Sequence, residues 1–155
     1  MKIRTVMLIA VATAVTLASA AAAGPAPTKQ RVQIDTKYPG ATFTLTALQG
    51  GALKPDSGTH GCKTEETKSE VSLNGQQTWP WTCPALAFTG KHGTLVLRSQ
   101  YAWIEAGGPY NIATGTWKVV RGTGQYARVT GGGRNARVGT AIIERVRYQG
   151  YLTSP

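Results

Sequence analysis

Apolar and polar residues alternate along much of this chain, and the alternation has the period of a β-strand. In residues 41–48, alanine, phenylalanine and leucine alternate with threonine, as expected for a strand that is buried on one face. Similar segments cover residues 70–74, 85–89, 94–98, 99–105, 114–120 and 134–152. The last segment is long enough for two strands or for one bent pair.

Glycine-rich turns separate these predicted strands. Asn74-Gly75 is typical of a tight hairpin turn, and Gly90 to Gly93 joins two apolar runs in the same way. Gly107-Gly108-Pro109 interrupts the pattern again. No segment shows convincing helical periodicity. We therefore expect an all-β, single-domain fold without substantial helix, either a sandwich or a small antiparallel barrel.

The first residues have the pattern of a targeting segment. Lys2 and Arg4 precede an apolar run over residues 5–17, and small residues follow it, so we expect a signal peptide over 1–23 that is cleaved after Ala20 or Ala23. The alternative is an uncleaved anchor, but the run is shorter than the roughly 20 residues of a membrane-spanning helix. The expected product is secreted, with a leader and first strand over 24–40 and a barrel domain over 41–153.

The chain has two cysteines, and both lie in the part expected to be exported. In an oxidising compartment Cys62 and Cys83 would pair, which closes a loop of about twenty residues and contributes roughly 3 kcal/mol. The alternative is a metal site completed by His60 or His92. No spacing typical of metal ligands supports that alternative. We expect a disulfide and neither a metal nor another cofactor.

Several motifs together resemble one group of secreted bacterial proteins. They are Asp56-Ser57-Gly58-Thr59, the run from Gly90 to Arg98, Gly115-Thr116-Trp117, Gly122-Thr123-Gly124-Gln125-Tyr126-Ala127 and Gly131-Gly132-Gly133. The chain resembles the allene oxide cyclase and dirigent-like barrel superfamily over most of residues 41–153. This resemblance implies an eight-stranded antiparallel barrel with a potential interior cavity. It implies no particular activity, because the superfamily includes cyclases, stereochemistry-guiding proteins and members of unknown role.

Residues 122–127 also match the dinucleotide-binding fingerprint G-x-G-x-x-A. That fingerprint requires a following helix whose N-terminus holds the pyrophosphate. Here three glycines, Gly131 to Gly133, would end any helix. We interpret the motif as a sharp turn in which Tyr126 plugs one end of the barrel, and we do not expect nucleotide binding.

Acidic residues are few, and two of them are candidates for chemistry. Glu105 follows Tyr101 and Trp103 at a spacing of two, so the three share one face of a strand. If that face lines a cavity, burial would raise the pKa of Glu105 and allow acid or base catalysis. If it faces outward, Glu105 is simply solvated. Glu144 likewise either faces the interior or pairs with an arginine on a neighbouring strand.

Aromatic residues complete the list of candidates. The expected cavity-lining residues are Tyr101, Trp103, Glu105, Trp117 and Tyr126, and the catalytic candidates are Glu105, Tyr101 and Glu144. Trp79-Pro80-Trp81 could form a platform for carbohydrate, or could pack against the disulfide.

The chain is strongly basic, with a net charge of +10 that becomes +8 without Lys2 and Arg4. Such a protein is attracted to anionic polymers, lipids or nucleic acid. Nucleic acid is disfavoured, since aromatic and basic residues do not interleave here. We expect a basic outer surface that includes Arg121, Arg128, Arg134, Arg137, Arg145 and Arg147. The alternative is that these charges serve solubility alone.

These observations favour a secreted, non-catalytic barrel that binds a small apolar ligand or an anionic surface component. Two alternatives stay open. The first is a cyclase-like enzyme that folds a flexible substrate in its cavity, where a glutamate and a tyrosine would converge. The second is a basic adhesion protein whose barrel interior is filled.

Overall fold

The structure is a computed structural model that describes residues 26–67, 71–73 and 76–155. The predicted signal peptide and its cleavage sites lie outside these residues, as does the predicted turn Asn74-Gly75. No helix within the described ranges is long and apolar enough to cross a membrane.

The protein is all-β, as predicted. Its strands are β1 (Thr28–Tyr38), β2 (Thr42–Ala47), β3 (Asp56–Cys62), β4 (Glu66–Thr67), β5 (Val71–Leu73), β6 (Gln76–Gly90), β7 (Gly93–Glu105), β8 (Asn111–Gly122), β9 (Thr130–Gly139) and β10 (Glu144–Ser154). A short 3-10 turn, η1 (Gly124–Tyr126), precedes β9. The long segment 134–152 therefore contains two strands.

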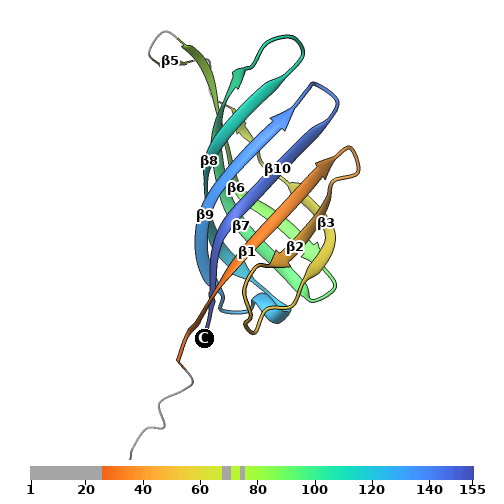
Figure 1. Cartoon of the computed structure of the whole chain (residues 1–155), viewed down its shortest axis with the longest axis vertical. Coiled ribbons are helices and arrows are strands. Elements are labelled where there is room, and N and C mark those ends of the chain that lie inside the picture. Colours follow the sequence, from red (N-terminus) through yellow and green to blue (C-terminus); the bar gives the residue numbers. More distant parts are fainter. Residues whose placement is uncertain (1–25, 68–70, 74–75) are drawn as a thin grey trace, which may run out of the picture.

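Eight of these strands form a closed antiparallel barrel (Figure 1). They follow the order β3-β2-β1-β10-β9-β8-β7-β6, and pairing of β3 with β6 closes the ring. The short strands β4 and β5 pair with β6 outside this ring. The eight-stranded barrel that the family resemblance implied is thus present.

The two ends of the barrel differ. At one end, which we call the closed end, η1 and the β6–β7 turn cover the interior, and the C-terminus lies close by (Figure 1). At the other end, which we call the mouth, lie the β1–β2, β7–β8 and β9–β10 turns. Because the strands are antiparallel, β1, β3, β7 and β9 run from the closed end to the mouth.

Apolar side chains fill the barrel near the closed end. On β1, burial alternates so that Val32 and Ile34 face the interior. They join a core that also contains Phe43, Leu45, Phe88, Leu95, Leu97, Trp117, Tyr126 and Leu152. Burying a leucine or phenylalanine contributes roughly 1.5–3 kcal/mol, so this cluster is the main source of stability.

The glycine motif builds the closed end. Gly124 has φ +59°, a conformation that glycine adopts without strain. A Cβ at this position would collide with the carbonyl oxygen of His92 in the β6–β7 turn. The backbone N–H of Gln125 donates to the same carbonyl at 2.8 Å. The motif therefore folds as the predicted sharp turn, and β9 rather than a helix follows it.

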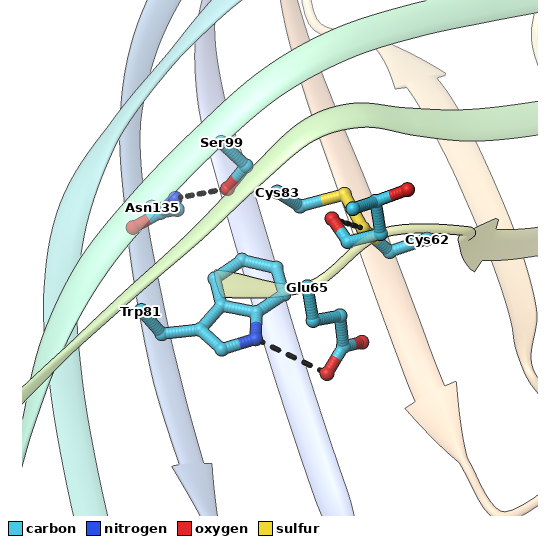
Figure 2. Close-up of a disulfide and its surroundings, with 7 residues drawn as sticks. Cys62, Glu65, Trp81, Cys83, Ser99 and Asn135 are labelled. Carbon is cyan, nitrogen blue, oxygen red and sulfur yellow. Dashed lines mark hydrogen bonds between the residues drawn. A yellow bond between two sulfur atoms is a disulfide. The ribbon is translucent and has the colours of Figure 1, made fainter. Parts of the chain in front are cut away.

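The disulfide between Cys62 and Cys83 is present, as predicted (Figure 2). It joins the end of β3 to β6, with the two Cα atoms 6.1 Å apart. Cys83 is completely buried. The disulfide therefore reinforces the pairing that closes the barrel.

Candidate functional site

A cavity of about 460 Å³ opens at the mouth. The barrel is thus packed at its closed end and hollow at the other. Side chains from strands distant in sequence line the cavity, among them His60 on β3, Trp81 on β6, Tyr101 on β7 and Arg137 on β9. The cavity lies within the size range of small-molecule binding sites.

One wall of the cavity is aromatic. Trp81 and Tyr101 are cross-strand partners whose rings stack, with centroids 4.4 Å apart and planes inclined by 17°. The next pair along the same strands, Trp79 and Trp103, stacks at 4.2 Å and 16°. Trp81 also donates its indole N–H to Glu65 at 3.3 Å (Figure 2). These contacts fix the positions of the aromatic side chains.

Next to the aromatic wall, the lining contains an ion pair. Arg137 Nη2 lies 2.7 Å from Glu144 Oε2, and only 14% of the Arg137 side chain is exposed. The guanidinium carbon is 5.6 Å from the centre of the Tyr101 ring. Arg137 was expected on the outer surface, and that expectation is wrong. On β9, Val138 faces outward and Arg137 inward, where Glu144 neutralises its charge.

Three polar atoms of the cavity lining lack a partner within the described part of the chain. They are Nε2 of His60, Oδ1 of Asn111 and Nε of Arg137. Buried polar atoms in folded proteins are almost always hydrogen-bonded, to protein or to water. These atoms are unsatisfied but almost inaccessible, so a small side-chain movement would bring them into hydrogen-bonding contact with a molecule in the cavity.

Burial favours the neutral forms of three titratable groups in the cavity, Tyr101, Tyr148 and His60. Burial raises the pKa of Tyr101 and that of Tyr148, so both hydroxyls stay protonated. Burial also lowers the pKa of His60, although a hydrogen bond with the Lys37 backbone and the charge of Glu144 oppose it. At neutral pH the cavity thus offers neutral hydroxyl and imidazole groups beside one internally compensated ion pair.

A second layer of hydrogen bonds supports the cavity floor. Asn135 donates its side-chain N–H to the Ser99 hydroxyl at 3.0 Å, and both residues are buried (Figure 2). Burial raises the pKa of the neighbouring Tyr148, and Ser99 tends to lower it. The Tyr148 ring packs edge-on against Phe88 with centroids 5.6 Å apart.

The structure brings some predicted site residues together and separates others. Tyr101, Trp103 and Glu144 line the cavity, as a cavity or catalytic role requires. Glu105 is exposed at the end of β7, outside the cavity lining. Trp117 is buried in the core, where its indole N–H donates to the carbonyl of Arg134 at 3.0 Å. Tyr126 is buried at the closed end, as the plug interpretation predicted.

The other predicted basic residues lie on the exterior. Arg121, Arg128, Arg134, Arg145 and Arg147 are exposed. Arg147 pairs with Asp35 on the neighbouring strand at 2.7 Å.

Sequence reasoning missed two polar residues of the site. From the sequence, His60 was considered only as a possible metal ligand, yet it lies on β3 and faces the cavity. Asn111 follows a glycine-proline turn, and nothing in the local sequence indicates that it belongs to a site. For metal chemistry, no group of three or more His, Cys, Asp or Glu side chains within the described ranges is placed to hold an ion.

Comparison with known proteins found no match of adequate significance among family models, curated proteins or solved structures. The site must therefore be interpreted from its own geometry.

Proposed function

We propose that this protein is a secreted, non-catalytic barrel that binds a small, mostly apolar molecule in its mouth cavity. One observation carries the proposal: a cavity of about 460 Å³ combines an aromatic wall with polar atoms that lack partners among the described residues. Ligand-binding pockets typically have this composition, an apolar lining with a few convergent polar groups. The resemblance to the allene oxide cyclase and dirigent-like superfamily agrees with it.

The lining suggests the shape and chemistry of the ligand. The aromatic pair Trp81 and Tyr101 favours an apolar body that packs against the exposed edges of the two rings. His60 on β3 and Asn111 on β8 flank the aromatic strands β6 and β7, and their side chains favour one or two polar groups on the ligand that can hydrogen-bond beside the wall. Because Glu144 compensates Arg137, the ligand need not be charged.

Export of the protein is part of this proposal. The basic and apolar pattern of residues 1–23 supports it, and so does the disulfide, since disulfides persist mainly in oxidising compartments.

A neutral aromatic fluorophore, N-phenylnaphthylamine, would test the proposed binding. We expect its fluorescence to rise on addition of the purified, disulfide-bonded protein. Trp81→Leu should weaken binding, because Trp81 lines the cavity. Tyr151→Leu is the control: Tyr151 is an exposed aromatic residue near the closed end of β10 and lies outside the lining. Equal effects of the two substitutions, or no binding at all, would contradict the proposal.

One observation favours a second candidate function, a cyclase-like enzyme. Glu144 converges with Tyr101 and Tyr148 inside the same cavity, as the enzymatic alternative required. The Glu144 carboxylate could abstract a proton from a substrate held against the aromatic wall, and a protonated phenol of Tyr101 or Tyr148 could donate one. Chromatography distinguishes the candidates: a ligand identified by screening is recovered unchanged from a binding protein, and as an isomer of equal mass from an enzyme. Glu144→Gln should abolish conversion but preserve binding.

A further inference from the structure

The charged residues of the barrel are divided between its two ends. In the closed half, the described cations are Lys29, Arg31, Lys54, Lys91, Arg98, Lys118, Arg121, Arg128 and Arg134, against one acid, Asp56. In the mouth half, the described residues comprise five cations, Lys37, Lys63, Arg137, Arg145 and Arg147, against five acids, Asp35, Glu65, Glu66, Glu105 and Glu144. The excess positive charge therefore belongs to the closed half.

The acid of the closed half does not neutralise these cations. Asp56 is only 5% exposed, and its carboxylate accepts hydrogen bonds from Tyr126 and from three backbone N–H groups. Both ion pairs seen in the described residues lie in the mouth half. The cations of the closed half are thus free to meet an external anion.

Strand register arranges some of these cations in a row across the barrel. Arg31 on β1 lies opposite Tyr151 on β10, which lies opposite Gly132 on β9. Gly132 lies opposite Lys118 on β8, and Lys118 opposite Arg98 on β7. Since adjacent strands are about 4.8 Å apart, the row spans about 19 Å around the barrel.

We propose that the closed half binds a flexible anionic polysaccharide, one that carries carboxylate groups along its chain. Guanidinium and ammonium groups bind carboxylates by charge-assisted hydrogen bonds. Cations spread over a convex surface of five strands are best reached by a chain that bends around them. The row, with Arg134 beside it, provides repeated contacts of that kind.

The convex shape of the closed half and its lack of uncovered aromatic rings among the described residues argue against nucleic acid as the partner. A DNA duplex is stiff, with a persistence length of about 50 nm, so it would touch only one side of a convex barrel. A single strand needs exposed aromatic rings on which its bases stack. Tyr151 is an exposed ring on this half, but the Lys29 ammonium lies 4.3 Å from its centre and covers it.

The distribution of apolar residues argues against a lipid surface. Most of the large apolar side chains exposed in the described residues lie around the mouth: Tyr38, Tyr110, Ile112, Val138, Ile142 and Ile143. A membrane-bound surface would be expected to combine such side chains with its cations.

Binding through the closed half would also leave the mouth cavity open, so this inference does not depend on the proposed ligand.

Binding to polygalacturonate, a polysaccharide with one carboxylate per sugar, would test this inference. The triple substitution Arg31→Gln, Arg98→Gln and Lys118→Gln removes three charges from the row. The matched control, Lys37→Gln, Lys63→Gln and Arg145→Gln, removes three exposed charges from the mouth half. Titration calorimetry at low salt would measure both, and circular dichroism and N-phenylnaphthylamine binding would show that each variant is folded.

We expect the row variant to lose about tenfold or more in affinity and the control variant to lose about twofold or less. Binding by the unsubstituted protein should weaken steeply as the salt concentration rises. Equal losses in the two variants would overturn the inference, because net charge alone would then explain binding. Tighter binding to a short DNA duplex or to phosphatidylglycerol vesicles would overturn the assigned partner, and absence of polygalacturonate binding would overturn it entirely.

Discussion

Tyr126 donates its hydroxyl hydrogen to Asp56 Oδ2 at 2.9 Å, and this bond joins the glycine motif to the start of β3 across the closed end. The Asp56 carboxylate also accepts the backbone N–H groups of Ser57, Lys91 and His92. A single buried side chain thus links β3, the β6–β7 turn and η1. This explains why a tyrosine follows the Gly-Thr-Gly turn.

Tyr126→Phe should reduce the free energy of unfolding by about 1–3 kcal/mol, because it removes one bond to a buried carboxylate. Urea denaturation followed by tryptophan fluorescence would measure the change. Tyr151→Phe, which removes an exposed hydroxyl, is the control and should change stability by less than about 0.5 kcal/mol. Equal effects would show that the Tyr126–Asp56 bond contributes nothing specific.

Asp56 should also make stability depend on pH. Burial tends to raise its pKa, but the hydrogen bonds from Tyr126 and the three backbone groups outweigh burial and lower the pKa below 3.8. A carboxyl whose pKa is lowered in the folded state stabilises the protein above its unfolded pKa, and that stabilisation is lost as pH falls through the folded pKa. Unfolding of the native protein and of Asp56→Asn should therefore be compared from about pH 6 downward. The stability difference between them should shrink below about pH 4, and a constant difference would contradict this prediction.

Gly124→Ala should destabilise the closed end through a steric collision. Gly108, in the β7–β8 turn, provides a matched control, because it has the same φ of +59° but open space where an added Cβ would lie. Both substitutions introduce the strain of a left-handed alanine, about 1 kcal/mol. Only Gly124→Ala also forces a Cβ against the carbonyl of His92, so it should lower the unfolding midpoint clearly more than Gly108→Ala. Equal midpoints would show that the turn adapts.

Replacing both cysteines by serine should cost about 3 kcal/mol, because the loop between Cys62 and Cys83 is then unconstrained in the unfolded chain. Urea unfolding of the oxidised protein, the reduced protein and the double variant would measure it. Reduction and substitution should have similar effects, and an unchanged midpoint in both would rule out this contribution.

Within the ion pair, Arg137→Met alone should destabilise the protein more than Arg137→Met combined with Glu144→Gln. The single substitution leaves the Glu144 carboxylate beside an apolar side chain, whereas the double substitution removes both charges. A double-mutant cycle in urea would measure the coupling. Strictly additive effects would indicate that the pair contributes no interaction energy.

Local patterns in the sequence predicted many of the strands but missed one that lines the site. Strand β2 alternates regularly, with Phe43 and Leu45 buried, and its sequence predicted it. Strand β3 has glycine and histidine at Gly58 and His60 on its inner face, and no apolar alternation marks it. It becomes a strand because β2 and β6 supply hydrogen-bonding partners on both sides.

The candidate site was only partly predictable for a related reason. Tyr101, Trp103 and Glu105 do share one face, but Glu105 extends beyond the cavity into solvent. On β9 the apolar residue Val138 is 49% exposed while Arg137 faces inward. From hydrophobicity alone, Val138 would be expected to face the interior and Arg137 the solvent.

The amino-acid sequence by itself determined the β character of the chain, the positions of several turns and the cysteine pair, because these depend on residues that are near in sequence or on composition. Only the tertiary structure decided which face of each strand lines the interior, since apolar side chains occur on both faces. It also decided that Arg137 meets Glu144, that the mouth stays hollow, and that uncompensated cations gather at the closed end. Those features depend on barrel closure and strand register, which relate residues far apart in the sequence.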